Sequence, residues 1–171
     1  MGKKKWLIIN YNLPTEPSRH RVATWRGLKK SGAVNIQQSM WILPCTEDNL
    51  SALEKISRDI ESNNGESLLM ETAFFNEKHE ERIISLFNNM RDEEYKELIN
   101  ESTKYIAEIE KETTMRKLTY AELEEEAELK KLLSWYNRIK SRDMFSSPEG
   151  KKAGEILIQI KSIFKWHSEM V

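Results

Sequence analysis

The spacing of hydrophobic residues changes along the chain, from short runs before residue 75 to long helical repeats after it. Short β-branched and aromatic runs predict strands, and apolar residues at three- and four-residue steps predict helices. The expected order is a strand at 6–11, a helix at 17–31, strands at 34–37 and 40–43, a helix at 46–62 and a strand at 67–74. This order predicts a four-stranded sheet with both helices on one face.

Residues at the helix ends support these boundaries. Thr15 is expected to cap the first helix, and Gly32 to end it. Thr46, followed by Asn49, is expected to begin the second helix in the same way. The apolar residues of the first helix follow helical spacing and are expected to be buried; they are Val22, Trp25 and Leu28.

From residue 76 onward the hydrophobic period is helical throughout. The adjacent β-branched pair Thr113–Thr114 is expected to break or bend the first long helix, because such residues are weak helix formers. Thr119 and Glu122 form a capping box for the next helix, and Ser147–Pro148 predicts the start of the last one. We therefore expect an α+β protein with a ferredoxin-like βαββαβ domain at 3–75 and a long-helix extension at 76–171 packed on it.

Composition restricts the class of protein. The 171 residues are 39% hydrophobic and 32% charged, which fits a globular chain with much helix surface. No apolar run approaches the roughly 18 residues of a membrane helix, and the run after the basic start is too short for a signal peptide. Cys45 is the one cysteine, so no internal disulfide is possible. These features predict a cytoplasmic protein without a membrane partner.

Basic residues gather at the beginning of the chain. Residues 1–30 carry eight Lys and Arg against Glu16 alone, while the rest carries 19 basic and 27 acidic residues. Arg19, Arg26 and Lys30 are seven and four residues apart, which places them on one helix face. Such a face predicts phosphate binding, although a solvated surface or ion pairs with the acidic run at 122–128 would give the same pattern. The candidate nucleic-acid-binding residues are Lys3, Lys4, Lys5, Arg19, Arg21, Arg26, Lys29 and Lys30.

Catalytic chemistry has little support in the sequence. His20 stands near a helix start, where a structural role is the simpler interpretation. His79 and His167 lack a second ligand at metal spacing, and Cys45 has no histidine near it in sequence. No glycine-rich phosphate loop or nucleophile elbow is present. We therefore expect no enzyme, no catalytic or metal-binding residues and no cofactor.

Several segments resemble the N-terminal region of the ChrB family of chromate-resistance regulators. They are Tyr11–Arg19, Arg21–Lys29, Gly32–Val34, Gln37–Pro44, Arg91–Asp92 with Tyr95, and Trp135 with Arg138–Ile139 and Arg142–Phe145. The resemblance implies a DNA-associated regulatory module for chromate resistance. Members of the family carry a second, C-terminal domain to which chromate sensing is assigned. Since this sequence ends at Val171 without it, we expect a transcriptional regulator module that lacks the sensor.

A more distant similarity connects the first 75 residues to the ferredoxin-like subunit of CRISPR adaptation complexes and to phenylacetate-pathway repressors. In the nuclease-like members an Asp follows the strand-ending Tyr, whereas Asn12 stands here, and an amide lacks the anionic oxygen that magnesium favours. A metal-dependent nuclease using Asn10 or Asn12 is therefore an alternative. A scaffold that binds a separate sensor chain is another.

The same related folds imply a homodimer. Its expected interface is the hairpin formed by Gln37, Gln38, Ser39 and Trp41, in which the indole would supply packing area. The other interpretation is an ordinary hairpin turn with Trp41 in the core of its own chain, and the sequence leaves both open.

Overall fold

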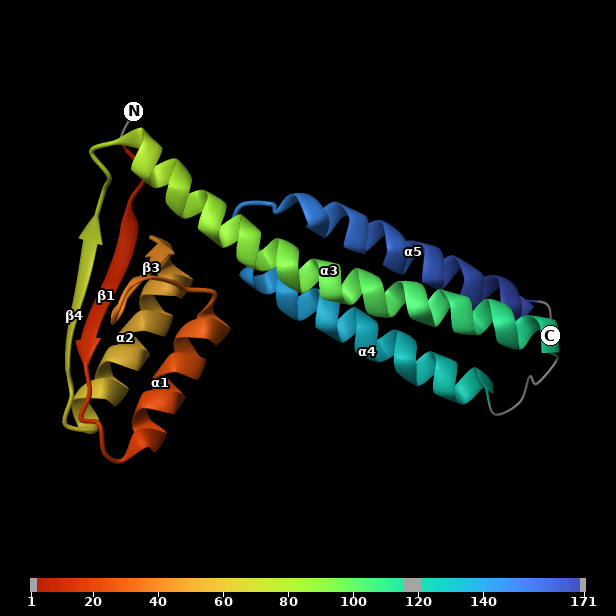
Figure 1. The fold of residues 1–171 in the computed structure, drawn as a ribbon, viewed down its shortest axis with the longest axis horizontal. Coiled ribbons are helices and arrows are strands. Elements are labelled where there is room, and N and C mark those ends of the chain that lie inside the picture. The colour runs from red at the N-terminus through yellow and green to blue at the C-terminus, as the bar shows by residue number, and fades with distance from the viewer. Residues whose placement is uncertain (1–2, 116–120, 170–171) are drawn as a thin grey trace. The chain divides into compact units, whose positions relative to one another are not determined.

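A computed structural model describes residues 3–115 and 121–169 of the chain (Figure 1). The chain divides into two compact units, residues 1–86 and residues 87–171, which we call unit 1 and unit 2. Unit 1 contains the sheet, and unit 2 consists of helices. In the notation of Figure 1, the helix α3 begins in unit 1 and continues into unit 2.

Unit 1 has the predicted order of elements. They are β1 (Trp6–Asn12), α1 (Ser18–Ser31), β2 (Val34–Gln37), β3 (Met40–Pro44), α2 (Glu47–Ser62) and β4 (Glu66–Thr72). The strands form one antiparallel sheet in the order β2-β3-β1-β4, which is the ferredoxin-like arrangement. Helix α2 packs on β1 and β4 and contacts α1, and Figure 1 shows both helices on the same side of the sheet. The predicted α+β fold class is confirmed.

The sheet divides its side chains between two faces. Ser67 of β4 shares a 2.6 Å hydrogen bond with Ser57 of α2, so the odd-numbered side chains of β4 face the helices. On the other face, the first turns of α3 (Glu77–Met115) cover one end of β1. There the Trp6 indole donates a 2.9 Å hydrogen bond to Glu80, and Ile83 is buried. The core of unit 1 thus lies mainly between the sheet and α2.

In unit 1, two of the three helix ends predicted from the sequence agree with the structure. The Thr46 hydroxyl accepts a hydrogen bond from the backbone N–H of Asn49 at the start of α2. Gly32 ends α1 with a φ of 88°, where an L side chain would be strained. The expected cap at Thr15 is wrong, because α1 begins only at Ser18 and Pro17 occupies its capping position without a side-chain cap. The proline disfavours helical geometry at the residue before it, so the helix starts after the proline.

The buried face of α1 is narrower than predicted. Leu28 is fully buried, but Val22 and Trp25 remain 45% and 48% exposed. Thr24 is buried beside Leu28, and Gly27 approaches Ile56 of α2. Because α1 contacts α2 along this line, the predicted burial of Val22 and Trp25 is wrong, and both lie on the solvent side.

Unit 2 is a bundle of three helices: the rest of α3, α4 (Ala121–Arg142) and α5 (Pro148–Glu169) (Figure 1). Its core contains buried residues of all three, namely Tyr95, Leu98, Tyr105, Ile109, Leu129, Leu132, Ile139, Ala153, Leu157 and Ile160. The predicted start of α5 at Ser147–Pro148 is confirmed. Helix α3 ends at Met115, one residue after the Thr113–Thr114 pair, and α4 begins at Ala121, which agrees with the break expected at that pair. The predicted capping box at Thr119, and the side chains of Glu122–Glu126, lie outside the described residues.

Candidate nucleic-acid interface and neighbouring polar sites

The exposed face of α1 carries the strongest candidate site. Arg19, Arg26 and Lys30 are all exposed and project away from the side that holds Leu28. Within the described residues, none of these three cations has an ion pair or a hydrogen bond from its side chain. The basic stripe of the sequence is therefore a set of solvated charges that an incoming anion can reach.

The order of charged residues along α1 is not the one that would stabilise the helix most. Anionic side chains stabilise the amino end of a helix and cationic ones its carboxyl end. Lys29 and Lys30 in the last turn obey this rule, but the first turn has no acidic residue. Arg19 and Arg21 stand at the amino end instead, where the helix dipole opposes them. These two arginines therefore add positive charge at the end of α1 that is already positive.

Apolar side chains lie between these charges. The half-exposed Trp25 ring has the Lys29 ammonium 4.6 Å from its centroid, a cation–π contact. Val22 lies one turn before Trp25 and is 45% exposed. The face thus combines hydrogen-bond donors with apolar area. Sequence periodicity missed this feature because it treats every regularly spaced hydrophobic residue as core.

The three N-terminal lysines contact a different part of unit 1. Lys3 donates a hydrogen bond to the Phe74 carbonyl at 3.2 Å and lies over the Phe75 ring. Lys4 lies over the Trp6 ring, and Lys5 forms a 3.2 Å ion pair with Glu71 of β4. The structure therefore brings the α1 cations together, whereas Lys3–Lys5 gather around the end of β4.

The hairpin between β2 and β3 has one side-chain hydrogen bond to β1 and another within its own turn. The Ser39 hydroxyl donates to the Asn10 side chain at 3.0 Å, and the Asn35 amide donates to the Gln38 carbonyl at 2.6 Å. Gln37 and Gln38 are exposed, whereas Trp41 is only 4% exposed. A partner at this hairpin would meet the two glutamines rather than the indole, and the predicted interface stays a prediction.

An open cavity of about 1130 Å³ lies where β1 ends. Burial raises the pKa of the Tyr11 phenol, while a hydrogen bond from Trp41 and the charge of Arg21 act in the opposite direction. Arg21 thus faces this cavity as well as belonging to α1. The lining is otherwise mostly polar: Asn10, Asn12, Leu13, Gln38, Ser39, Glu61, Gly65, Glu66, Ser67 and Leu68. His20 is elsewhere, half-buried in a groove between α1 and α2, and Cys45 is half-buried after β3.

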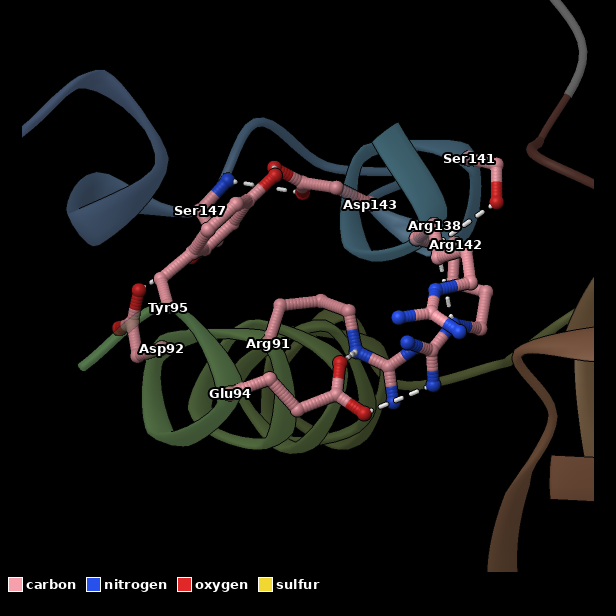
Figure 2. Close-up of polar contacts among 9 residues, drawn as sticks. All are labelled: Arg91, Asp92, Glu94, Tyr95, Arg138, Ser141, Arg142, Asp143 and Ser147. Carbon is pink, nitrogen blue, oxygen red and sulfur yellow. Dashed lines mark hydrogen bonds and ion pairs between the residues drawn. The ribbon is translucent and has the colours of Figure 1, made fainter. Parts of the chain in front are cut away.

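Unit 2 contains a polar network that ties its three helices together (Figure 2). Asp143, after α4, accepts hydrogen bonds from the Tyr95 hydroxyl and the Ser147 amide, both at 2.9 Å. Asp92 of α3 accepts from the Ser147 hydroxyl and from the Glu149 amide, which caps the start of α5. These contacts fix the loop between α4 and α5 on α3.

A buried arginine extends the same network (Figure 2). Arg91 is 4% exposed, and its Nε lies 3.2 Å from a Glu94 oxygen whose partner oxygen binds Arg142 at 2.7 Å. Burial lowers the pKa of Arg91; the Glu94 charge opposes this and the Arg142 charge adds to it. Two guanidinium groups thus share one carboxylate. Arg91, Asp92, Tyr95, Arg142 and Asp143 all belong to the segments that carry the family resemblance, and the structure brings them together in this network.

No helix in the described part of the chain combines the length and the apolar character needed to cross a lipid bilayer.

The fold and these sites define a class of protein: a ferredoxin-like α+β unit with a basic first helix, joined through a shared helix to a helical bundle. A family profile described as "Protein ChrB, N-terminal" matches residues 21–171, and the chain belongs to this family. The resemblance predicted from the sequence is thereby confirmed. A curated relative, Protein ChrB of Cupriavidus metallidurans, is 28% identical over 92 residues, or 54% of this chain. The aligned part is 28% of that relative's length.

Proposed function

We propose that the chain is a regulatory module of chromate resistance that binds the phosphate backbone of DNA through the exposed face of α1. The observation that supports this most directly is the set of three exposed cations, Arg19, Arg26 and Lys30, which have no ion pair within the described residues. Guanidinium groups suit this role because their planar fork donates two hydrogen bonds to one phosphate.

The dimensions of α1 suit a duplex. Its 14 residues make a rod of about 21 Å, and the major groove of B-DNA admits an α-helix. Val22 and Trp25 would supply apolar contact to base edges, for which the thymine methyl group is a usual partner. The cations would then position the helix, and the apolar pair would add a modest sequence preference.

Charge reversal on α1 tests the proposal. We expect Arg19→Glu/Arg26→Glu to weaken binding to a labelled DNA duplex by roughly tenfold or more at low salt, because phosphate contacts dominate such affinity. Fluorescence anisotropy with the full chain measures it. Lys151→Glu/Lys161→Glu on α5 is the matched control, since both lysines are exposed and the net charge changes equally. Equal affinity of wild type and the α1 variant, or no binding by wild type, would contradict the proposal.

The cavity at the end of β1 favours a second candidate, a metal-dependent nuclease. Glu61, Glu66, Asn10 and Asn12 all line it, and oxygen ligands of these types hold magnesium. Within the described residues, no group of three or more His, Cys, Asp or Glu side chains is placed to hold a metal ion. Incubation of labelled RNA and DNA with magnesium or manganese, with and without a chelator, separates the two functions. We expect no cleavage, and chelator-sensitive cleavage lost in Glu66→Gln would favour the nuclease.

A further inference from the structure

The sheet of unit 1 has two edges of different character. β2 is one edge, with four residues and an irregularity in its pairing with β3 between Asn35 and Gln37. β4 is the other, with seven residues in unbroken register against β1, neither proline nor lysine, and its two charged residues, Glu66 and Glu71, near its ends. Natural sheets protect edges by shortening, bulging or charging them. By this criterion β2 is a protected edge, and β4 is open to another strand.

The outer face of β4 is apolar and exposed. Ser67 points toward α2 through its hydrogen bond with Ser57, so Leu68 and Met70 lie on the opposite face of the sheet. Leu68 is 64% exposed and Met70 is 41% exposed. Within the described residues, β1 is the only strand that pairs with β4, so the backbone groups along its other side have no strand partner. An accessible backbone edge next to apolar side chains is the usual template for β-strand addition.

We propose that β4 pairs antiparallel with β4 of a second copy of this chain, about a two-fold axis through Leu69. The sequence of the strand is self-complementary in this register. Leu68 lies opposite Met70, so the two copies bring their exposed apolar side chains together. Each glutamate lies opposite a neutral residue: Glu66 faces Thr72, and Glu71 faces Ser67. Opposed pairs of this kind are the unit of stabilisation between antiparallel strands.

Other registers would pair the two β4 strands less favourably. A shift by one residue in either direction would place side chains from opposite sheet faces across from each other, and in one of the two directions it would also oppose Glu66 with Glu71. A shift by two residues leaves only part of the strand paired, and it sets Leu69 against Ser67 or Glu71. The register centred on Leu69 uses the whole strand, keeps the faces matched and avoids like charges.

This interface differs from the hairpin dimer predicted from the sequence, which would use Gln37 and Gln38 near the other edge of the sheet. It is also independent of the proposed DNA-binding face, because Leu68 and Met70 lie on the opposite side of the sheet from α1. Failure of one proposal therefore leaves the other untouched.

Paired charge substitutions test the register. Leu68→Glu/Met70→Glu removes the apolar pair and sets like charges opposite each other, whereas Leu68→Lys/Met70→Glu removes the same pair but sets Lys opposite Glu. We expect wild type to dimerise in sedimentation velocity experiments at about 1–100 µM. The Glu/Glu variant should be monomeric, and the Lys/Glu variant should dimerise at least about tenfold more tightly than it, because two opposed pairs change sign in each dimer.

Two controls complete the experiment. Gln37→Glu/Gln38→Glu changes the hairpin and should leave dimerisation as in wild type, and far-UV circular dichroism checks that each variant is folded. Hydrogen exchange of wild type supplies a measurement without substitutions, in which β4 amides should become more protected as concentration rises. A monomeric wild type, equal association of the two β4 variants, or a dimer lost only in the hairpin variant would each overturn the proposal.

Discussion

Tyr95 is a phenol held in its neutral form by its surroundings. It is 1% exposed, and its hydroxyl donates to the Asp143 carboxylate at 2.9 Å. Burial raises its pKa above the usual 10.0, and the hydrogen bond and negative charge of Asp143 raise it further. An ionised Tyr95 would face a carboxylate without water to screen the repulsion. The junction of α3, α4 and α5 therefore depends on the protonated state of this side chain.

A pH dependence follows from the sign of that shift. Because the pKa is higher in the folded state, the stabilisation is fully present below about pH 10 and is lost as pH rises from there through the folded-state pKa. We expect urea unfolding to show a larger loss of stability between about pH 8 and pH 11 in wild type than in Tyr95→Phe. The variant lacks the titrating group, so the difference between the two proteins isolates Tyr95 from the other tyrosines. Parallel pH profiles would contradict this assignment.

At the residue scale, the sequence predicted what local spacing controls and missed what distant contacts control. Arg19, Arg26 and Lys30 are on one exposed face as the helical period required. Tyr95 and Asp143 are 48 residues apart, and neither carries a local signal that it would meet the other. Single-sequence periodicity has no information on such pairs, because they depend on how helices dock.

At the scale of elements, Gly65 lies between α2 and β4, where the chain passes very close to the end of β1. A Cβ atom at this position would lie 2.6 Å from the Asn12 carbonyl oxygen and 2.7 Å from Ile60 Cγ2. Gly27 in α1 is different, since its nearest neighbours are Ile56 carbons at 3.7 Å, an ordinary contact distance. Packing therefore excludes a side chain at Gly65 but leaves room for one at Gly27.

We expect Gly65→Ala to lower the free energy of unfolding by about 1–3 kcal/mol, because the strand ends must move to accept the methyl group. Gly27→Ala should raise it by up to about 1 kcal/mol, since alanine is the better helix former and fits the space. Urea denaturation followed by circular dichroism measures both. A destabilised Gly27→Ala or a neutral Gly65→Ala would show that the packing differs from this description.

The sequence predicted the order of elements in unit 1 correctly because each strand and helix has its own period and end signals. The same reasoning failed for Val22 and Trp25, which follow the helical period but lie outside the contact with α2. The break expected at Thr113–Thr114 does agree with the structure, because α3 ends at Met115, next to this pair of weak helix formers. Periodicity identifies an apolar face, but packing decides how much of that face is covered.

For the whole molecule, the small net charge of −1 conceals a strong field at one end of the sequence. Residues 1–30 carry eight basic side chains and one acidic one. In the structure this excess divides between α1 and the lysines near β4, and Lys5 is paired with Glu71. The charge available to a polyanion is therefore smaller than the sequence count suggests.

The salt dependence of DNA binding measures that available charge. The logarithm of the affinity falls linearly with the logarithm of salt concentration, with a slope of roughly one per phosphate contact. We expect Arg19→Glu/Arg26→Glu to reduce the slope by roughly two, and a change at Lys5 to leave it nearly unaltered. Anisotropy titrations at several salt concentrations supply the slopes. An unchanged slope in the α1 variant would mean that these arginines contact no phosphate.

The position of helix α3 across both units determines where the protein can be truncated. Its 39 residues span about 58 Å without interruption, and the boundary between the two units falls inside it, between Leu86 and Phe87. A truncation there would leave a frayed helix end on each fragment, close to the buried residues Ile83 on one side and Phe87 on the other. A fragment of unit 1 should therefore extend past the first turns of α3, which cover Trp6, and a fragment of unit 2 should begin before Phe87, which packs on Phe145.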